Sequence, residues 1–182
     1  LGLGHAVLCA RPVINDEPFA VILADDLIEG TPVVMRQMVE AYDKLRCSVL
    51  GVQTVKPEET PHYGIVKPVP LAPDMDKVEA IVEKPRPEVA PSTTAVVGRY
   101  ILTPRIFHYL ASGKPGAGGE IQLTDAISSL LAEERVVAFR FNGKRYDCGS
   151  KIGYLEATVA FGLRHPEVGA QFRTLLRSIT TN

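Results

Sequence analysis

The sequence predicts an α/β protein with a mixed, mostly parallel sheet flanked by helices, antiparallel additions and a C-terminal helical extension. Two observations predict this class. Apolar runs of strand length alternate with helical patterns along much of the chain, which is typical of βαβ units. Between residues 64 and 103, three strand patterns follow one another without a helical pattern between them. Such a helix-free series favours antiparallel pairing.

The first third of the chain reads as strand, helix, strand. "PFAVILADD" (18–26) is an apolar run, and we expect a strand buried on both faces. "TPVVMRQMVEAYDKLRC" (31–47) has apolar residues at helical spacing, with Thr31 as expected N-cap and Pro32 at the first helical position. "SVLGVQTV" (48–55) is again a buried-strand pattern. This alternation predicts a Rossmann-like arrangement.

The middle of the chain carries the antiparallel additions. Its strand patterns are "GIVKPVPLA" (64–72), "KVEAIVEKP" (77–85) and "TAVVGRYILT" (94–103). Loops rich in proline, such as "KPRPEVAPS", separate them. Since proline and serine clusters mark turns, each pattern is expected to be a separate strand.

Helical patterns return after residue 103. "TPRIFHYLA" (103–111) predicts a short helix with Thr103 as its cap, and a glycine-rich loop (113–120) leads to a second helix over 121–134. The segment 135–149 predicts strand, turn and strand.

The last segment, residues 150–179, predicts two amphipathic helices broken at "HPE". No internal repeat or dividing linker is found, so we expect one domain over residues 1–182, with the helices of about 150–182 part of it.

Composition excludes several classes of function. Twenty basic and 21 acidic residues leave a net charge of −1, so neither nucleic acid nor an anionic membrane is an expected partner. The apolar run "FAVILA" is far shorter than the ~20 residues of a transmembrane helix. Three cysteines without CxxC spacing argue against a disulfide framework or zinc site, and we expect a cytoplasmic protein.

Acidic residues follow two of the predicted strands. Asp25 and Asp26 end the first apolar run, and Asp147 lies between a strand and a helix that begins near Ser150. Open α/β sheets bind ligands at such strand ends, and Mg²⁺ needs only one or two carboxylates. The helix N-terminus would suit phosphate, and Lys151 would add a positive charge. A cap or turn role for the aspartates, and a solvated role for Lys151, stay open as alternatives.

A second candidate site combines charge and small residues. The adjacent Glu83 and Lys84 end a strand pattern, and together they would bind a sugar phosphate through diol hydroxyls and phosphate oxygens. The alternative is a pair of exposed edge-strand charges that oppose aggregation. Gly64 and Gly98 fall at strand positions, which indicates either close approach of a ligand or a β-bulge.

The order and spacing of several motifs resemble those of the bacterial UTP–glucose-1-phosphate uridylyltransferases. The motifs are "GLGHAV", "FAVILADD", "YGIV", "VEKP", "VVGRY", "GEIQLTDAI" and "YDCGSKIGYLEATV", and they cover nearly the whole chain. The resemblance implies the nucleotide-diphospho-sugar transferase fold. It also implies formation of UDP-glucose and pyrophosphate from UTP and glucose 1-phosphate, by in-line attack assisted by Mg²⁺ and without a covalent enzyme intermediate.

The same resemblance implies the site residues. Asp25, Lys84, Asp147 and Lys151 would be catalytic. The individual roles would be uracil contact by Gly2, Mg²⁺ binding by Asp25 and Asp147, glucose contact by Gly64, Glu83 and Gly98, and phosphate contact by Lys84 and Lys151. Asp26 matches a less constrained position and receives no ligand role.

The chain departs from the family pattern at its start. The family begins with a strand and a glycine-rich GxGTRxxP-type loop that cradles the triphosphate, and this chain begins after that loop. We therefore expect an N-terminally truncated domain that has no uridylyltransferase turnover by itself. The alternatives are a glucose-1-phosphate thymidylyltransferase and a non-catalytic module for sugar-phosphate binding or oligomerisation. By resemblance, the whole protein is expected to be a homo-oligomer.

Overall fold

The computed structural model describes residues 1–113 and 115–180. The chain divides into two compact units. Unit 1 comprises Leu1–Leu23 and Gly30–Gly143, and unit 2 comprises Ala24–Glu29 and Lys144–Asn182. A single domain over the whole chain stays a prediction, and the units are described separately below.

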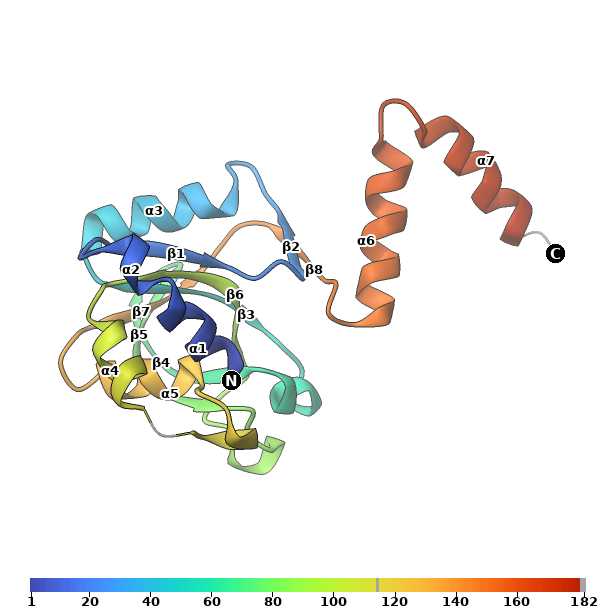
Figure 1. Ribbon diagram of the computed structural model, residues 1–182. Coiled ribbons are helices and arrows are strands. Elements are labelled where there is room, and N and C mark those ends of the chain that lie inside the picture. The colour runs from blue at the N-terminus through green and yellow to red at the C-terminus, as the bar shows by residue number, and fades with distance from the viewer. Residues whose placement is uncertain (114, 181–182) are drawn as a thin grey trace. The chain divides into compact units, whose positions relative to one another are not determined.

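Unit 1 is built on a six-stranded mixed sheet (Figure 1). The strand order is β1-β6-β3-β7-β5-β4, and a further pairing joins β4 to β6. The strands are β1 (Phe19–Ile22), β3 (Ser48–Thr54), β4 (Gly64–Ala72), β5 (Met75–Glu83), β6 (Thr94–Leu102) and β7 (Val136–Arg140). The predicted α/β class with helices around a mixed sheet is confirmed.

The proportion of parallel strands is a correction to the prediction. Among the described strands of this sheet, β3 and β7 run parallel and the other pairs are antiparallel. The helix-free middle of the chain is the reason, because it supplies β4, β5 and β6, half of the strands. Strands joined by short loops pair antiparallel.

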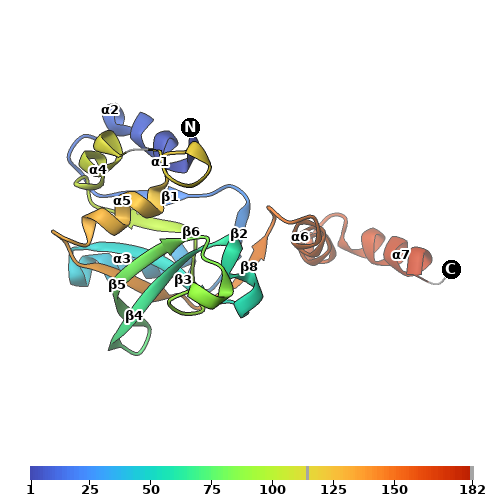
Figure 2. The same cartoon turned by 90° about the horizontal axis from the view of Figure 1, so that it is seen from below.

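Helices lie on both faces of the sheet. They are α1 (Gly2–Cys9), α2 (Arg11–Ile14), α3 (Val34–Leu45), α4 (Ile106–Ser112) and α5 (Leu123–Leu130), with short 3₁₀ turns at Pro57–His62, Pro87–Val89 and Ala117–Gly119. Leu50 and Val52 of β3 join a core with α4 and α5, whereas Gly51 between them faces Met38 of α3. Because side chains alternate along a strand, these helices cover opposite faces. Figure 2 shows α1, α4 and α5 gathered together.

The central strands are buried and β1 is not. Every residue of β6 is buried, and Val49 and Leu50 of β3 are fully buried. In β1, burial alternates and Ile22 is 56% exposed, so the predicted burial on both faces is wrong. The reason is that β1 stands at the end of the strand order.

Both proline-led helices begin two residues later than predicted. Helix α3 begins at Val34, and the amide of Gln37 donates a 2.7 Å hydrogen bond that holds the Pro32 carbonyl outside the helix. Before α4, the N–H of Ile106 bonds to the carbonyl of Thr103 at 3.2 Å, which closes a separate tight turn. The Thr103 hydroxyl donates to Glu134 rather than capping the helix.

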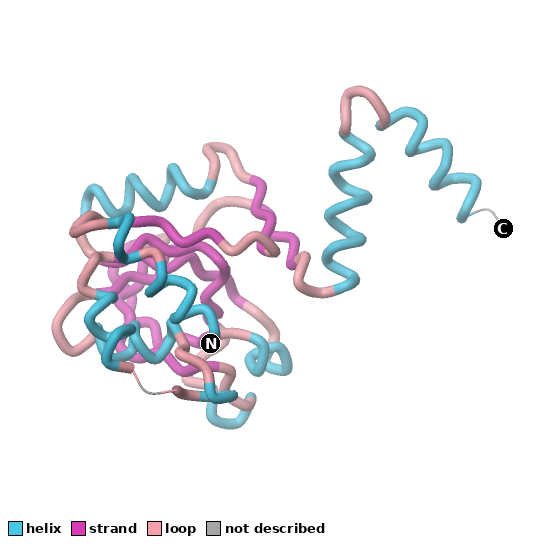
Figure 3. The backbone as a smooth tube through the Cα atoms, in the orientation of Figure 1, coloured by secondary structure: helices cyan, strands magenta, loops and turns pink. Residues whose placement is uncertain are grey.

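Unit 2 contains a two-stranded antiparallel sheet and two helices. The strands are β2 (Asp26–Glu29) and β8 (Lys144–Asp147), and the helices are α6 (Lys151–Arg164) and α7 (Gly169–Thr180). The C-terminal helices and the break between them are confirmed, and Figure 3 shows the loop that separates them. The predicted strand, turn and strand over 135–149 also form, although β7 and β8 join different sheets.

No described helix combines the length and apolar character needed to cross a membrane.

Candidate active site

Asp25 and Asp147 converge within unit 2. Strands β2 and β8 pair Asp26 with Asp147, and the N–H of Cys148 donates to the Asp25 carbonyl at 2.8 Å. These backbone bonds bring both carboxylates to Gly149. Asp25 Oδ2 lies 3.0 Å, and Asp147 Oδ1 3.1 Å, from the point that a β-carbon on Gly149 would occupy.

The chemistry of this pair fits a hard divalent cation. Asp25 is exposed, and its carboxylate makes no hydrogen bond or ion pair with the described residues. Within the described chain, no group of three or more His, Cys, Asp and Glu side chains gathers as a metal site. Mg²⁺ does not require such a group, because it usually keeps several waters and takes one or two carboxylates plus substrate phosphates. Asp25 and Asp147 are the residues that would hold it.

A buried ion pair that was not predicted from the sequence lies behind Asp147. The Arg145 side chain is 8% exposed and donates through Nε to Asp26, which is 7% exposed. Its Nη2 lies 3.4 Å from Asp147 Oδ2. Asp26 is therefore an ion-pair partner within the fold, consistent with its receiving no ligand role. The alternation of Arg145 and Asp147 along one strand was the available signal.

The predicted helix start beside Asp147 is present. Ser150 caps α6 by accepting a 3.0 Å hydrogen bond from the Gly153 N–H, and Lys151 is the first helical residue. An open pocket of about 350 Å³ is lined by Cys148, Gly149, Ser150, Lys151, Tyr154 and Leu155. Exposed Lys151 thus lies on the same pocket as the glycine between the two carboxylates.

Gly64 and Glu83 are brought together in unit 1. They face each other across the antiparallel pair β4–β5, and Glu83 Oε2 lies 3.5 Å from the point that a β-carbon on Gly64 would occupy. The Glu83 side chain is only 13% exposed. The alternative of an exposed charge is therefore wrong for Glu83.

Lys84 has an unusual backbone conformation. Its φ is 46°, in the left-handed region that few non-glycine residues adopt. Its N–H donates to the Tyr63 carbonyl at 3.0 Å, and its Nζ lies 3.6 Å from Glu83 Oε1. Such backbone outliers cluster at functional sites, and this one turns the chain as β5 ends.

Thr124 is a neighbour of Gly64 that was not predicted from the sequence. Its Oγ1 lies 3.1 Å from the point that a β-carbon on Gly64 would occupy, so it shares the surroundings of Glu83. The residue belongs to α5, and only the packing of that helix brings it to β4. The sequence contained no signal for this contact.

Gly2 and Gly98 are placed by other contacts. Gly2 has φ of 76° and packs so closely on Glu120 and Ile121 that a β-carbon would lie 2.8 Å from Glu120 Cβ. The carbonyl of Gly98 accepts hydrogen bonds from the Leu23 N–H at 3.0 Å and from Arg99 Nη1 at 2.7 Å. The register of β3 and β6 shifts at this part of β6, which supports the β-bulge alternative for Gly98.

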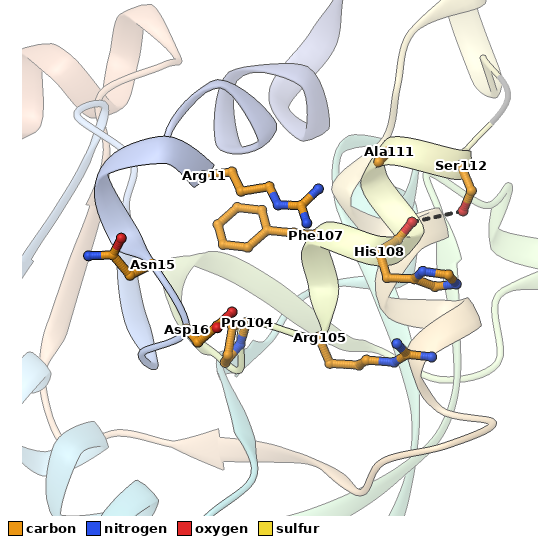
Figure 4. Close-up of a pocket in the computed structure, with 9 residues that line it drawn as sticks. All are labelled: Arg11, Asn15, Asp16, Pro104, Arg105, Phe107, His108, Ala111 and Ser112. Carbon is orange, nitrogen blue, oxygen red and sulfur yellow. Dashed lines mark hydrogen bonds between the residues drawn. The ribbon is translucent and has the colours of Figure 1, made fainter.

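Another pocket of unit 1 contains none of the predicted site residues. It measures about 580 Å³ and is lined by Arg11, Asn15, Asp16, Pro104, Arg105, Phe107, His108, Ala111 and Ser112 (Figure 4). Arg105 donates two hydrogen bonds, of 2.7 and 2.9 Å, to Glu133. The Arg105 guanidinium and then the Tyr109 hydroxyl lower the pKa of Glu133 to about 2.

Comparison with known families defines the class of this protein. The nucleotidyl transferase family model matches residues 1–162, and the chain belongs to that family. A UTP–glucose-1-phosphate uridylyltransferase of Pseudomonas aeruginosa PAO1 is 52% identical over 160 residues, covering 86% of this chain and 57% of the relative. The Bacillus subtilis protein of the same name is 48% identical over 170 residues, covering 93% and 58%. The resemblance inferred from the motifs is confirmed.

Solved structures show the same relationship. A UDP-glucose pyrophosphorylase complexed with UDP-glucose has a TM-score of 0.86 and 48% identity, over 88% of this chain and 62% of that one. A UTP-bound enzyme of the same type from Acinetobacter baumannii has a TM-score of 0.83 and 39% identity, over 96% and 61%. A further structure, from Bacillus anthracis, has 23% identity and a TM-score of 0.71 and shares the fold. The chain spans 57–58% of the length of the two curated relatives.

Proposed function

We propose that the protein carrying this chain is a nucleotidyltransferase that forms UDP-glucose and pyrophosphate from UTP and glucose 1-phosphate. The observation that carries the proposal is the meeting of Asp25 and Asp147 at Gly149. Its support is the 52% identity to a UTP–glucose-1-phosphate uridylyltransferase.

The reaction joins two anions, so its main obstacle is charge repulsion. In this proposal, Asp25 and Asp147 hold Mg²⁺, which when bound offsets negative charge on the phosphates. Lys151 of unit 2 and Lys84 of unit 1 are each proposed to add positive charge for phosphate oxygens. The sugar phosphate attacks the α-phosphorus in line and pyrophosphate leaves, so the chain needs no nucleophile of its own.

The sugar is bound through Glu83 and its neighbours. A carboxylate accepts two hydrogen bonds and therefore fits two adjacent sugar hydroxyls. Gly64 opposite Glu83 leaves the space that a side chain would fill. Gly98 contributes to the glucose contact and Gly2 to the uracil contact in this proposal.

The proposal also extends to cellular setting and assembly. The odd number of cysteines and the absence of CxxC spacing support a cytoplasmic location. Exposed apolar side chains on α6 and α7, including Ile152, Leu155 and Ile179, support a homo-oligomer. Sedimentation of the intact protein tests the assembly, and a monomer would contradict it.

The direct test is a product assay on the intact protein that carries this chain. Supplied with glucose 1-phosphate, Mg²⁺ and either UTP or dTTP, it should release pyrophosphate and form UDP-glucose with a clear preference for UTP. Equal rates with dTTP would instead identify a thymidylyltransferase. Binding of UDP-glucose without turnover would identify a non-catalytic module and overturn the proposal.

A further inference from the structure

Arg145 lies behind the predicted metal ligands, on the same face of the β2–β8 sheet as Asp147. Residues two apart in a strand point to one face, and Asp26 stands directly opposite Asp147 in the register. Arg145 is thus the diagonal neighbour of Asp26, a distance that a long side chain spans. The geometry of two short strands is sufficient to bring the three charged groups together.

The guanidinium bridges two carboxylates and uses a different oxygen of Asp147 from the one facing Gly149. Its Nε donates to Asp26, and its Nη2 lies 3.4 Å from Asp147 Oδ2. The other oxygen, Oδ1, accepts a 3.1 Å hydrogen bond from the Gly149 N–H and faces the same point as Asp25. A planar guanidinium presents its donors in a fixed fork, so it constrains the orientation of the carboxylate as well as its position.

We propose that Arg145, itself held by Asp26, is a positioning residue that orients the Asp147 carboxylate for binding of a divalent cation. Burial supports this role, because the Arg145 and Asp26 side chains are 8% and 7% exposed and form a well-shielded pair. Hydrogen-bond partners of metal ligands commonly fix ligand orientation in this way. The inference rests on the proposed function.

A role of Arg145 through its charge and a role in positioning Asp147 predict opposite effects of its removal on cation binding. The cluster of Asp25, Asp26, Asp147 and Arg145 has a net charge of −2. If the guanidinium acted only through its charge, its removal would strengthen cation binding, since a nearby positive charge repels a cation. If it orients Asp147, removal weakens binding although the cluster becomes more negative.

The experiment measures binding of Mn²⁺ alone by calorimetry, in the intact protein that carries this chain. The variants are Arg145→Gln, the double variant Asp26→Asn/Arg145→Gln, and the control Arg164→Gln. The double variant keeps the net charge of the cluster and leaves no buried charge unpaired. Arg164 belongs to the same unit, its side chain is 52% exposed, and it pairs with Glu29. Its variant therefore tests the loss of an arginine that does not contact Asp147.

The double variant should bind Mn²⁺ about tenfold more weakly, and Arg145→Gln should also bind more weakly. Arg164→Gln should bind as the unaltered protein does. Thermal unfolding of each variant checks that it is folded. If Arg145→Gln is not folded, Arg145→Lys replaces it as the milder substitution. Unchanged or tighter binding in the folded double variant overturns the inference. If Asp25→Asn abolishes Mn²⁺ binding while the double variant binds Mn²⁺ normally, only the proposed role of Arg145 is wrong. If the unaltered protein binds no Mn²⁺, the proposed metal site is wrong as well.

Discussion

Asp25 and Asp147 each direct one carboxylate oxygen at the point that a β-carbon on Gly149 would occupy. The two oxygens lie 3.0 and 3.1 Å from that point. A backbone hydrogen bond of 2.8 Å between the Cys148 N–H and the Asp25 carbonyl fixes the two chain segments to each other. Two acidic residues far apart in the sequence therefore share one small region of unit 2, as a divalent cation would require.

Substitution of Gly149 by alanine should weaken cation binding. The added β-carbon would stand at the point that both carboxylate oxygens face. Its distances of 3.0 and 3.1 Å to these oxygens are shorter than most contacts that β-carbons make in proteins. The oxygens would have to move apart, so we expect the Mg²⁺ concentration for half-maximal turnover to rise several-fold. Titration of activity with Mg²⁺ measures this, with Tm as the check on folding. An unchanged Mg²⁺ requirement would show that Gly149 does not border the cation.

Substitution Glu83→Gln should weaken binding of glucose 1-phosphate. The variant keeps the size of the side chain and removes the charge, and hydrogen bonds to charged groups contribute about 1.5–3 kcal/mol. We expect KM for glucose 1-phosphate to rise about tenfold or more, with a smaller effect on KM for UTP.

Glu79→Gln is the matched control for Glu83. Glu79 lies on the same strand, β5, but its side chain is 52% exposed and pairs with Lys67 at 2.6 Å. Its substitution should leave both KM values within about twofold, because exposed ion pairs contribute little. Equal effects of the two substitutions would contradict a sugar-binding role for Glu83.

The pair of Arg105 and Glu133 should make stability depend on pH in the acid range. Hydrogen bonds from Arg105 and then from the Tyr109 hydroxyl lower the pKa of Glu133 from its ordinary value of 4.5 to about 2. A carboxyl whose pKa is lowered by folding stabilises the protein above its unfolded pKa, and this stabilisation is lost as the pH falls toward the folded pKa. The advantage of the unaltered protein over Glu133→Gln should therefore shrink between about pH 4.5 and pH 2.

Urea unfolding at several pH values measures this dependence. Arg105→Gln should reduce it as Glu133→Gln does, because the guanidinium is the first cause of the shift. Glu40→Gln removes an exposed glutamate of α3 and controls for the loss of one negative charge. A constant difference between the unaltered protein and Glu133→Gln from pH 6 to pH 3 would rule out the effect.

The sequence predicted local elements better than their pairing. The runs that form β3, β4, β5 and β6 were recognisable because apolar side chains and turn residues define a strand locally. The direction of pairing depends on partners elsewhere in the chain, and here β6 runs antiparallel to its neighbours β1 and β3. The two helix starts depend on such distant or side-chain partners as well: the Gln37 amide bonds to the Pro32 carbonyl before α3, and the Thr103 hydroxyl donates to Glu134 instead of capping α4.

In the candidate site, too, local features were predictable from the sequence and contacts between distant segments were not. Position after a strand was enough to indicate Asp25 and Asp147, since ligands bind at strand ends in this class of fold. For Arg145 the available signal was its alternation with Asp147 along one strand, and that spacing does not distinguish a buried arginine from one that faces solvent. Thr124 reaches Gly64 only through the packing of α5, a relationship that no spacing in the sequence contains.

The most direct test of the shared site is whether the binding of one cation requires both Asp25 and Asp147. Electron paramagnetic resonance should detect one Mn²⁺ site in the unaltered protein, and Asp25→Asn and Asp147→Asn should each weaken it strongly, whereas Asp43→Asn on α3 should not. Binding that is as tight in either variant as in the unaltered protein would contradict the shared site.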